Sequence, residues 1–369
     1  MFRKIIKWVA DSLIRKFSQA LPEWQDYVTE TMFAAPASYQ PTLPANVEMF
    51  SLIVKHRLGA LIAFRAHRIL RLNNVHVTWD GAVFHDLRLF IPSVVLTKFA
   101  SRFQDTLLLR QWVGAKVELP APCVAVCHDQ WSAGNYYHWL VDTLPRLLVL
   151  RQARPGMLLL LPQPIQPMPD YIQASAAVLG FTRYQFLAPG QILHAGCVIL
   201  PELTAPSLTQ NPAYIRQVQQ ELVATLSPES SPAFRKIYGA RDRRGVRTIV
   251  NEAELDEFLS ELGFEKVYFE DLTLSQQVKL MRETAILLGV HGAGMANMMF
   301  LQQGAKVIEL LNEEYGDQCY FRLASCLNLT YFLAPCTGTS DALENQSDMI
   351  VKVPVLKRII ESILVPSAI

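Results

Sequence analysis

The sequence has almost no net charge and no long apolar run, and each absence excludes a class of protein. Its 369 residues include 34 Lys and Arg against 33 Asp and Glu, which gives a formal net charge of +1. A chain this close to neutrality has no overall attraction for nucleic acid, so any anion site must be local. No apolar run is long enough to span a membrane, and the charged N-terminal stretch does not have the form of a signal peptide.

Several motifs of nucleotide enzymes and metal proteins are also missing. There is no Gly-x-x-x-x-Gly-Lys-Ser/Thr phosphate loop, and no Gly-x-Gly-x-x-Gly follows a first strand with an acidic partner for ribose. These absences argue against a nucleotide hydrolase and a nicotinamide-dependent dehydrogenase. The 8 histidines include no pair at His-x-x-x-His spacing, so we expect no zinc site and no cofactor.

The 6 cysteines do not have the paired spacing of zinc sites. None forms a Cys-x-x-Cys pair, and most have apolar neighbours. We therefore predict reduced thiols in the protein core and a cytoplasmic protein. The cysteines are Cys123, Cys127, Cys197, Cys319, Cys326 and Cys336.

Length and composition favour two domains. A chain of 369 residues exceeds what one core usually serves, and 51% of it is apolar. The best boundary is Ser-Pro-Glu-Ser-Ser-Pro at 227–232, which combines helix breakers with polar residues. We predict a helix over 1–20, an N-terminal domain over 21–227, a C-terminal domain over 233–345, and a last helical segment over 346–369 that packs back on the first domain.

Residues 2–17 form an amphipathic pattern. At helical spacing the apolar residues share one face and basic residues lie opposite. Such a helix fits two interpretations: contact with an anionic membrane surface, or docking on its own domain. The apolar face contains Phe2, Ile5, Ile6, Val9, Leu13 and Phe17, and the basic residues are Arg3, Lys4, Lys7 and Arg15.

Strand and helix patterns alternate after the boundary. Strands are predicted at 237–240, 266–269, 285–290 and 305–311, with helices at 252–262, 274–282, after Gly294 and around 317–327. This spacing predicts a parallel sheet covered on both faces, which is a Rossmann-like arrangement. Before the boundary, a strand at 123–127 precedes a helix at 135–152, but the first hundred residues are too ambiguous to order.

The sequence Gly-Val-His-Gly-Ala-Gly-Met-Ala-Asn at 289–297 joins a predicted strand to a predicted helix. Glycines allow a ligand to approach the backbone, and the free N–H groups of a first helical turn attract phosphate oxygens. Packing alone also explains many such turns. His291 favours binding, because ligands of open α/β sheets bind at the carboxyl ends of the strands.

A second polar cluster runs from Asn135 to Arg146 and is preceded by His128 and Asp129. On a helix His138 and Asp142 lie one turn apart, so the carboxylate can orient the imidazole as a general base or phosphate contact. The alternative is a structural ion pair between Asp142 and Arg146.

A third cluster, Arg241-Asp242-Arg243-Arg244-Gly245-Val246-Arg247, follows a predicted strand. Guanidinium groups bind diphosphate with paired hydrogen bonds and keep their charge. A nonspecific basic loop is the alternative; nucleic acid is disfavoured by the neutral net charge and the absence of interleaved aromatic residues.

Taken in their order along the chain, the three clusters resemble glycosyltransferase family 61 from about residue 120 to 335. The cluster at Asn135–Arg146 carries an Asn-x-x-His-Trp-x-x-Asp-x-Leu-Pro-Arg-like helix. The second half matches more extensively, with the residues Arg241, Arg247, Asn251-Glu252, Gly263-Phe264-Glu265, Leu274, Gln277, His291 to Asn297, Phe300 and Gly304 to Leu310.

The resemblance implies an α/β fold of the GT-B type, with two Rossmann-like domains whose parallel sheets face a cleft. It also implies an inverting, metal-independent transfer of a hexose or pentose from a nucleotide-diphosphate donor, which we expect to be a UDP-sugar. The expected donor-binding residues are Arg241, Arg247, His291, Gly292, Ala293, Gly294, Asn297 and Glu309.

The expected roles follow from this arrangement. The diphosphate would rest on Gly292–Gly294, and Glu309 would either accept from ribose hydroxyls or be a strand-end surface carboxylate. His138 with Asp142 is the candidate base, and His291 contacts a phosphate or sugar oxygen. The expected acceptor-side residues are Asn135, His128 and Arg146.

The chain resembles the bacterial members associated with capsular and other surface polysaccharides more than the eukaryotic ones. We expect a cytoplasmic enzyme, peripheral on the inner membrane face through 2–17, with a glycan or lipid-linked acceptor. The alternatives are a non-catalytic protein that binds sugar nucleotides or glycans, and a phosphotransferase using the same anion site. Product analysis distinguishes glycosidic transfer, binding and phosphate transfer.

Overall fold

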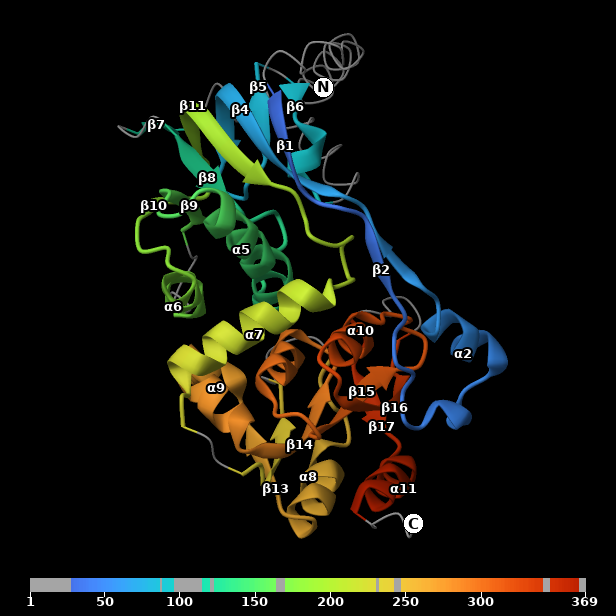
Figure 1. Cartoon of the computed structure of the whole chain (residues 1–369). Helices are drawn as coiled ribbons and strands as arrows, with labels where there is room; N and C mark the ends of the chain where they lie inside the picture. The colour runs from blue at the N-terminus through green and yellow to red at the C-terminus, as the bar shows by residue number, and fades with distance from the viewer. Residues whose placement is uncertain are drawn as a thin grey trace, which may run out of the picture. The chain divides into compact units, whose positions relative to one another are not determined.

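The computed structural model describes residues 28–86, 88–95, 115–119, 123–163, 170–229, 232–241, 247–340 and 346–364. The amphipathic stretch at 2–17 lies outside these residues. The chain divides into two compact units (Figure 1). Unit 1 contains the chain up to Ala37 together with Phe64–Ser207, and unit 2 contains Ser38–Ala63 and the chain from Leu208 onward.

This division differs from the predicted boundary at 227–232. Helix α7 (Pro212–Leu226) is part of unit 2, because Ile215, Val218 and Leu222 are buried on its inner face. That face packs against α9 (Leu274–Arg282) and the 3-10 helix η6 (Ala293–Phe300). The proline-rich stretch therefore follows a helix inside unit 2.

The described strands of unit 1 form one mixed sheet in the order β10-β9-β8-β11-β4-β5-β6, with β1 added beside β4 and β7 beside β11. Strands β10, β9, β8, β11 and β7 pair in parallel, whereas β4 pairs antiparallel with β11, β1 and β5. The strands are β1 (Val28–Ala34), β4 (His67–Thr78), β5 (Val83–His85), β6 (Arg88–Leu89), β7 (Ala115–Glu118), β8 (Val124–Val126), β9 (Leu159–Pro162), β10 (Tyr184–Leu187) and β11 (Gln191–Pro201).

The prediction of a purely parallel sheet is therefore wrong for unit 1. Strands β4 and β5 follow each other through a tight turn in which Gly81 has φ +82°, and strands joined so closely can only run antiparallel. The helical side of this unit was better predicted. The stretch expected at 135–152 is helical from Tyr136 to Ala153, and α6 (Tyr171–Val178) follows β9.

Two of the six cysteines are joined. Cys123, just before β8, forms a disulfide with Cys197 of β11, and the neighbouring residues Val124 and Val198 are paired in the sheet. The prediction of six reduced thiols is therefore wrong at this pair, because adjacent strands bring the two residues together across 74 positions. The other four, Cys127, Cys319, Cys326 and Cys336, are free and buried.

Unit 2 has the alternating arrangement that the sequence predicts. Its sheet has the order β13-β12-β14-β15-β16-β17, parallel except for the last pair. Numbered along the unit, the first five strands stand in the order 2-1-3-4-5, a doubly wound topology. They are β12 (Arg235–Gly239), β13 (Phe264–Val267), β14 (Thr284–Val290), β15 (Lys306–Asn312), β16 (Thr330–Gly338) and β17 (Met349–Val351).

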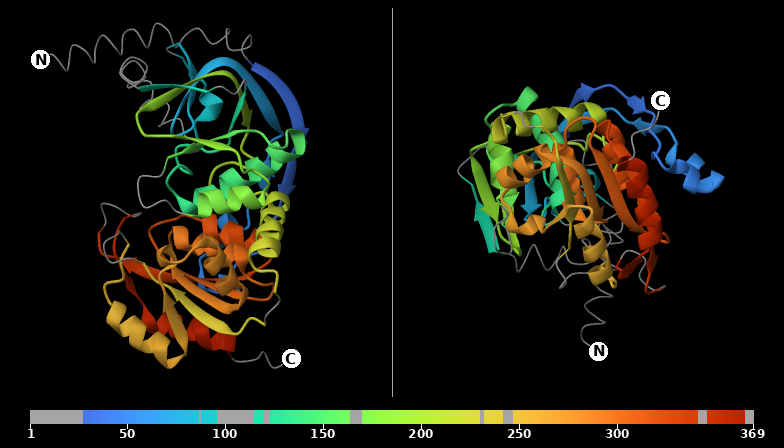
Figure 2. Two further views of the ribbon diagram at one scale, coloured as in Figure 1. Left: turned by 90° about the vertical axis from the view of Figure 1, so that its left-hand side faces the viewer. Right: turned by 90° about the horizontal axis from the view of Figure 1, so that it is seen from below.

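Helices cover both faces of this sheet (Figure 2). Helices α8 (Glu252–Glu261) and α11 (Val353–Leu364) pack on one face through Leu255, Leu259 and Ile360. Helices α9 and α10 (Cys319–Cys326) both pack against η6 and form a second group of helices. Thr273 begins α9 with a capping box. The C-terminal helix thus packs within unit 2, which differs from the predicted packing on the first domain.

The segment 38–63 contributes to unit 2 from far along the chain. It contains the 3-10 helix η2 (Val47–Met49) and α2 (Leu52–Leu58), flanked by the short strand pair β2 (Ala37–Tyr39) and β3 (Ile62–Phe64). The side-chain amide of Asn46 donates to the Leu333 carbonyl at 2.8 Å and accepts from the Leu333 N–H at 3.1 Å. These bonds attach the segment to β16.

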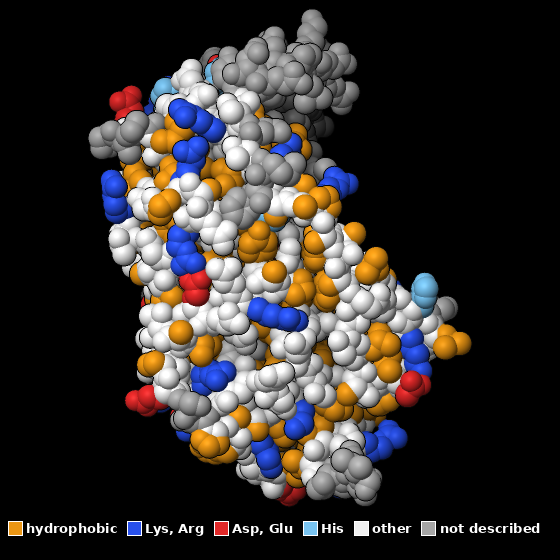
Figure 3. All heavy atoms as spheres, in the orientation of Figure 1, with side chains coloured by type: hydrophobic (Ala, Val, Ile, Leu, Met, Phe, Trp, Pro, Cys, Tyr) orange, Lys and Arg blue, Asp and Glu red, His pale blue; other side chains and the backbone are white. Residues whose placement is uncertain are grey.

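No helix within the described part of the chain has the length and hydropathy needed to cross a bilayer. On the face drawn in Figure 3, the Lys and Arg side chains are scattered and do not gather into one large patch.

Candidate functional site

A pocket of about 220 Å³ lies in unit 2 where the carboxyl ends of β12 and β14 meet. These two strands are neighbours at the point where the strand order reverses, which is where open α/β sheets leave a crevice for ligands. The lining residues are Gly239, Ala240, Arg241, Phe269, Glu270, Val290, Gly292, Ala293, Gly294 and Met295. The sequence motif at 289–297 therefore lies where the topology places a binding site.

Side chains pack closely against three glycines around this pocket. A Cβ on Gly292 would lie 2.3 Å from Nη1 of Arg241, and one on Gly239 would lie 2.7 Å from the Phe269 ring. A Cβ on Gly289 would lie 2.4 Å from the Met295 sulfur. The backbone of this turn forms part of the pocket wall through Gly292, Ala293 and Gly294, and η6 begins there.

Arg241 supplies the positive charge at this pocket. Its Nη1 donates to the His291 carbonyl oxygen at 3.0 Å, which ties the end of β12 to the turn after β14. Burial lowers the pKa of the Arg241 guanidinium, and the nearby Arg247 lowers it further. Two neighbouring guanidinium groups that repel each other favour a bound anion.

Arg247 is held in an uncommon backbone conformation. Its φ is +63°, a region that non-glycine residues adopt rarely. Its Nε is buried and has no hydrogen-bond partner among the described residues. The remainder of the basic cluster, 242–246, lies outside the described part of the chain.

His291 is fixed by a buried carboxylate. Nδ1 of His291 lies 2.5 Å from Oε1 of Glu309, and the hydroxyl of Tyr331 donates to the other oxygen of Glu309. Glu309 is 1% exposed, and burial raises the pKa of Tyr331 well above its usual value. Because Nδ1 donates to Glu309, the lone pair of the neutral ring lies on Nε2.

The buried position of Glu309 behind His291 does not match the expected contact between Glu309 and ribose hydroxyls. Both of its oxygens already have donors, and neither a ribose hydroxyl nor the solvent expected of a surface carboxylate reaches it at 1% exposure. Asn297 is likewise fully buried within η6 and is not part of the pocket lining. Both residues act from behind the pocket wall.

One group of three side chains in the described part of the chain has donor atoms close enough to share a metal ion. His291, Asp317 and Cys319 each offer one such atom, all within 4.8 Å of one another, and Nε2 of His291 is 3.9 Å from Asp317. The hydroxyl of Tyr315 donates to the same carboxylate oxygen of Asp317 at 3.2 Å.

The polar cluster of unit 1 begins at Asn135, whose side chain accepts from the N–H groups of Tyr137 and His138 and so caps the short helix α4 (Tyr136–His138). A π-helical turn, η4 (Trp139–Thr143), follows and leads into α5 (Leu144–Ala153). Such turns occur often at functional sites. Asn135 thus has a structural role as the cap of α4, in addition to its candidate role on the acceptor side.

His138 and Asp142 are hydrogen-bonded, as the four-residue spacing predicts. Nδ1 of His138 lies 2.7 Å from Oδ2 of Asp142, and both side chains are nearly buried. Burial raises the pKa of Asp142, and the bond to His138 opposes that shift. Nε2 of His138 has no hydrogen-bond partner among the described residues, so it is the atom left for chemistry.

His128 and Arg146 lie deeper than expected for residues that contact an acceptor. They are 1% and 4% exposed, respectively. His128 donates through Nε2 to the Trp79 carbonyl at 2.9 Å, and Arg146 donates through Nε to the Pro201 carbonyl at 2.7 Å. Arg146 is 3.8 Å from Asp129, so the ion pair considered with Asp142 is formed with Asp129 instead.

Sequence reasoning missed Phe269, Glu270 and Tyr331. Phe269 and Glu270 follow β13, whose carboxyl end is at the same edge of the sheet as the glycine turn, so topology could have indicated them. Tyr331 lies on β16, one strand beyond Glu309, and gave no local signal.

A family model described as Glycosyltransferase 61 matches residues 136–308. The EGF domain-specific O-linked N-acetylglucosamine transferase of Drosophila melanogaster is 35% identical over 92 residues, which are 24% of this chain and 18% of that protein. Its counterpart in Gallus gallus is 32% identical over 90 residues, 23% of this chain and 17% of that protein.

A plant relative was also found. The alpha-1,3-arabinosyltransferase XAT3 of Oryza sativa subsp. japonica is 35% identical over 72 residues, 19% of this chain and 12% of that protein. The chain thus matches less than a fifth of the length of each of these relatives.

Proposed function

We propose that the chain is a glycosyltransferase of family 61, the family that the match over 136–308 and the relatives support. The observation that carries the proposal is the pocket at the carboxyl ends of β12 and β14, where a glycine turn, a helix start and Arg241 meet. Such a pocket suits a diphosphate, which is the leaving group of a nucleotide-activated sugar. The proposed donor is a UDP-sugar carrying a hexose or pentose, and the proposed acceptor is a glycan or a lipid-linked glycan.

In this proposal the donor diphosphate rests on the backbone N–H groups at Gly292, Ala293 and Gly294. Arg241 and Arg247 stabilise the negative charge that develops as the nucleotide leaves. The support is the short link from Arg241 to the His291 carbonyl and the mutual repulsion of two guanidinium groups that a diphosphate would relieve.

We assign His291 to a hydrogen bond with the donor through Nε2, which accepts from a donor-sugar hydroxyl when the ring is neutral and donates to a phosphate oxygen when the ring is protonated. Glu309 and Tyr331 act as positioning residues, because they hold the ring through Nδ1 without reaching the pocket. Asn297 supports the turn from inside η6.

Inversion in one displacement needs a base beside the acceptor hydroxyl. In the proposed step the hydroxyl oxygen bonds to the anomeric carbon, the bond from that carbon to the diphosphate breaks, and the proton moves to Nε2 of His138. Asp142 stabilises the resulting imidazolium through Nδ1. Asn135, His128 and Arg146 hold the surrounding backbone on the acceptor side.

The transfer is proposed to need no divalent metal. We also propose a bacterial-type enzyme of surface-polysaccharide assembly, with peripheral membrane contact through 2–17. The runner-up is a non-catalytic sugar-nucleotide-binding protein, which would bind the donor but release no product.

The test is a panel of nucleotide-sugars, screened for binding by calorimetry and for slow donor hydrolysis, with and without a chelator. We expect one UDP-sugar to bind and hydrolyse, and Arg241→Ala to weaken its binding about tenfold or more, the usual effect of losing a charged hydrogen bond. Arg358→Gln, on the exposed side of α11, is the control.

Three results would count against the proposal. Unchanged donor binding and turnover in Arg241→Ala would remove the diphosphate placement, and an unchanged rate in Asp142→Asn would remove the base. Loss of activity on chelation would overturn metal independence and point to His291, Asp317 and Cys319 as metal ligands.

A further inference from the structure

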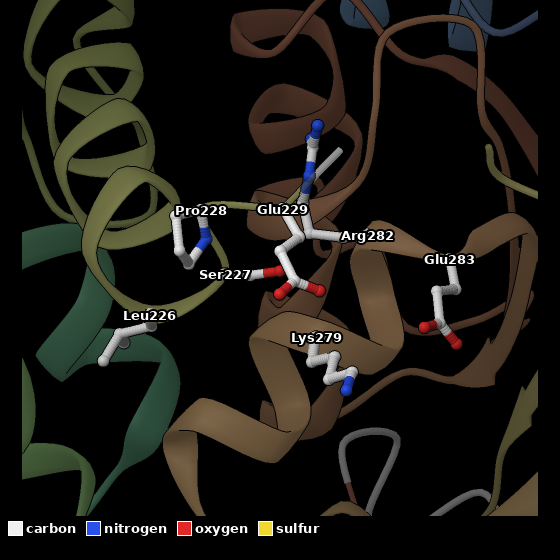
Figure 4. A pocket seen from close by; sticks show the side chains of 7 residues that line it. All are labelled: Leu226, Ser227, Pro228, Glu229, Lys279, Arg282 and Glu283. Carbon is white, nitrogen blue, oxygen red and sulfur yellow. The ribbon is translucent and has the colours of Figure 1, made fainter. Parts of the chain in front are cut away.

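A second, larger cavity lies in unit 2, away from the glycine turn. A pocket of about 450 Å³ is bordered by α7, by Arg282 of α9 and by the chain after η6 and α10. A neighbouring pocket of about 200 Å³ shares Ser227, Pro228, Glu229 and Arg282 with it, so the two form one trough. Figure 4 shows the smaller part, where the end of α7 faces Lys279, Arg282 and Glu283.

The described lining of the trough has more cationic than anionic side chains. Arg216 donates through Nε to the Cys326 carbonyl at 2.6 Å and through Nη2 to the Asn328 side-chain oxygen at 3.0 Å. Both partners are neutral, so the guanidinium is held in place and keeps its charge. Its remaining N–H groups are available to a ligand.

Arg282 adds a second guanidinium. Burial lowers its pKa, and its guanidinium has no hydrogen bond or ion pair within the described residues. Of the two acidic side chains nearby, Glu283 is bound to Arg235 at 2.9 Å, which leaves Glu229 against Arg216, Arg282 and Lys279. The trough therefore favours an anionic ligand.

The remaining lining suits a saccharide. Gln219, Gln220, Gln303 and Asn328 offer side-chain amides, which donate to and accept from hydroxyl groups. Val223 and Ala224, on the side of α7 that borders the trough, supply apolar surface for the carbon face of a sugar ring. The volume falls within the range of about 300–1,000 Å³ that is usual for small-molecule sites, and it exceeds what a single ion needs.

We infer that this trough is a binding site for an acidic saccharide, whose carboxylate pairs with Arg216 and Arg282 while its hydroxyls meet the amides. The inference rests on the proposed function, because a glycan acceptor gives a transferase a reason to hold a second stretch of saccharide. The trough would then retain an acidic acceptor chain at a distance from its reacting end. Guanidinium groups suit this role because they bind carboxylates with two parallel hydrogen bonds.

The test measures binding of trigalacturonate to the full chain without any donor, by calorimetry at low and high salt, beside neutral maltotriose. We expect trigalacturonate to bind, with weaker binding at high salt, and maltotriose to bind at least about tenfold more weakly. Arg282→Gln should weaken trigalacturonate about tenfold or more, and Arg282→Lys should restore part of the loss. Glucose 1-phosphate tests whether a phosphate replaces the carboxylate, and its binding in place of trigalacturonate would overturn the carboxylate assignment.

Arg358→Gln is the matched control, because it removes an exposed guanidinium elsewhere in the same unit. Equal binding of the two trisaccharides, or equal affinity in wild type and Arg282→Gln, would overturn the inference. The result is independent of the donor site: Arg241→Ala should bind trigalacturonate normally, even if no nucleotide-sugar binds to the protein.

Discussion

Two histidines that carry the candidate chemistry are each held through Nδ1 by a buried carboxylate. In unit 1 the partners, His138 and Asp142, stand four residues apart on one helical turn. In unit 2 they stand 18 residues apart, with His291 directly after β14 and Glu309 on the neighbouring β15. The same local chemistry thus arises from a short-range and from a long-range contact, and in both cases the carboxylate binds Nδ1 and not Nε2.

Glu309→Gln tests the positioning of His291. The amide oxygen can still accept from Nδ1, but it carries no charge to support a charged or strongly polarised imidazole. Loss of a charged hydrogen bond is worth about 1.5–3 kcal/mol, so kcat should fall about tenfold or more. Donor binding should change less than kcat. Glu361→Gln, an exposed carboxylate of α11, serves as the control, and equal kcat in both variants would remove the positioning role.

His128 makes the stability of the protein depend on pH. Burial lowers its pKa in the folded chain, so below the unfolded value of 6.5 the unfolded state binds the proton more readily and the free energy of unfolding decreases. Each such histidine contributes up to about 1.4 kcal/mol per pH unit. His128→Gln, which can still donate to the Trp79 carbonyl, should flatten this fall in urea unfolding between pH 7.5 and 5.5.

The same series includes His56→Gln, an exposed histidine, which should leave the slope unchanged. His67 and His76 also have pKa values lowered by burial, so the slope should shrink without vanishing. An identical slope in wild type and His128→Gln would contradict the prediction.

At the scale of elements, the arrangement of strands determines where the pocket lies. Strand β12 lies between β13 and β14. The chain after β12 crosses to β13 on one side, and the chain after β14 crosses to β15 on the other side, which opens a crevice between the ends of β12 and β14. The segments after β12, β13 and β14 all contribute to the pocket. Its residues come from three separate places in the sequence for this reason.

Gly292→Ala tests this close packing. The new methyl group would meet the Arg241 guanidinium, which can move because it is the end of a flexible side chain, but only by leaving the His291 carbonyl. We expect donor binding to weaken about tenfold, with a change in unfolding free energy of less than about 1 kcal/mol. In the control Gly59→Ala, the nearest atom to the new methyl is 3.4 Å away, so neither quantity should change. Normal donor binding in Gly292→Ala would show that Arg241 does not need its present position.

At the scale of the whole molecule, the two units do not follow each other in sequence, because unit 2 also includes Ser38–Ala63 from the early part of the chain.

Within unit 1, a disulfide joins Cys123, just before β8, to Cys197 of β11. It closes a loop with a separation of 74 residues. A covalent link across so long a loop removes many conformations from the unfolded chain.

The double variant Cys123→Ser, Cys197→Ser should therefore be less stable by about 2–4 kcal/mol in urea unfolding. Reductant should lower the stability of the wild type to a similar degree and leave the double variant unaffected. A wild type that does not respond to reductant would show that this pair contributes no covalent restraint.

The sequence predicted the parts of the fold that depend on local patterns. Helices α8, α9 and α10 and strands β12 to β15 were expected within a few residues, because alternating apolar periods and caps are short-range signals. The His138–Asp142 pair was expected for the same reason. No local pattern encodes the remaining contacts. The antiparallel pairing of β4 with β11 and the place of 38–63 in unit 2 depend on partners more than a hundred positions away. The contact of Tyr331 with Glu309 joins residues about twenty positions apart on separate strands.

The attachment of the segment 38–63 to β16 has a consequence for synthesis on the ribosome. Asn46 must wait until Leu333, 287 residues later, has been added before its side chain meets its native partner. At about 5–20 residues per second, this delay lasts about 15–60 s. Unit 1 can complete its sheet during that time, once β11 has emerged, while the early segment remains exposed. A nascent chain that stalls before β16 would thus leave this segment unanchored, and Leu58 and Ile62, which are buried in the folded chain, would be open to chaperones and proteases.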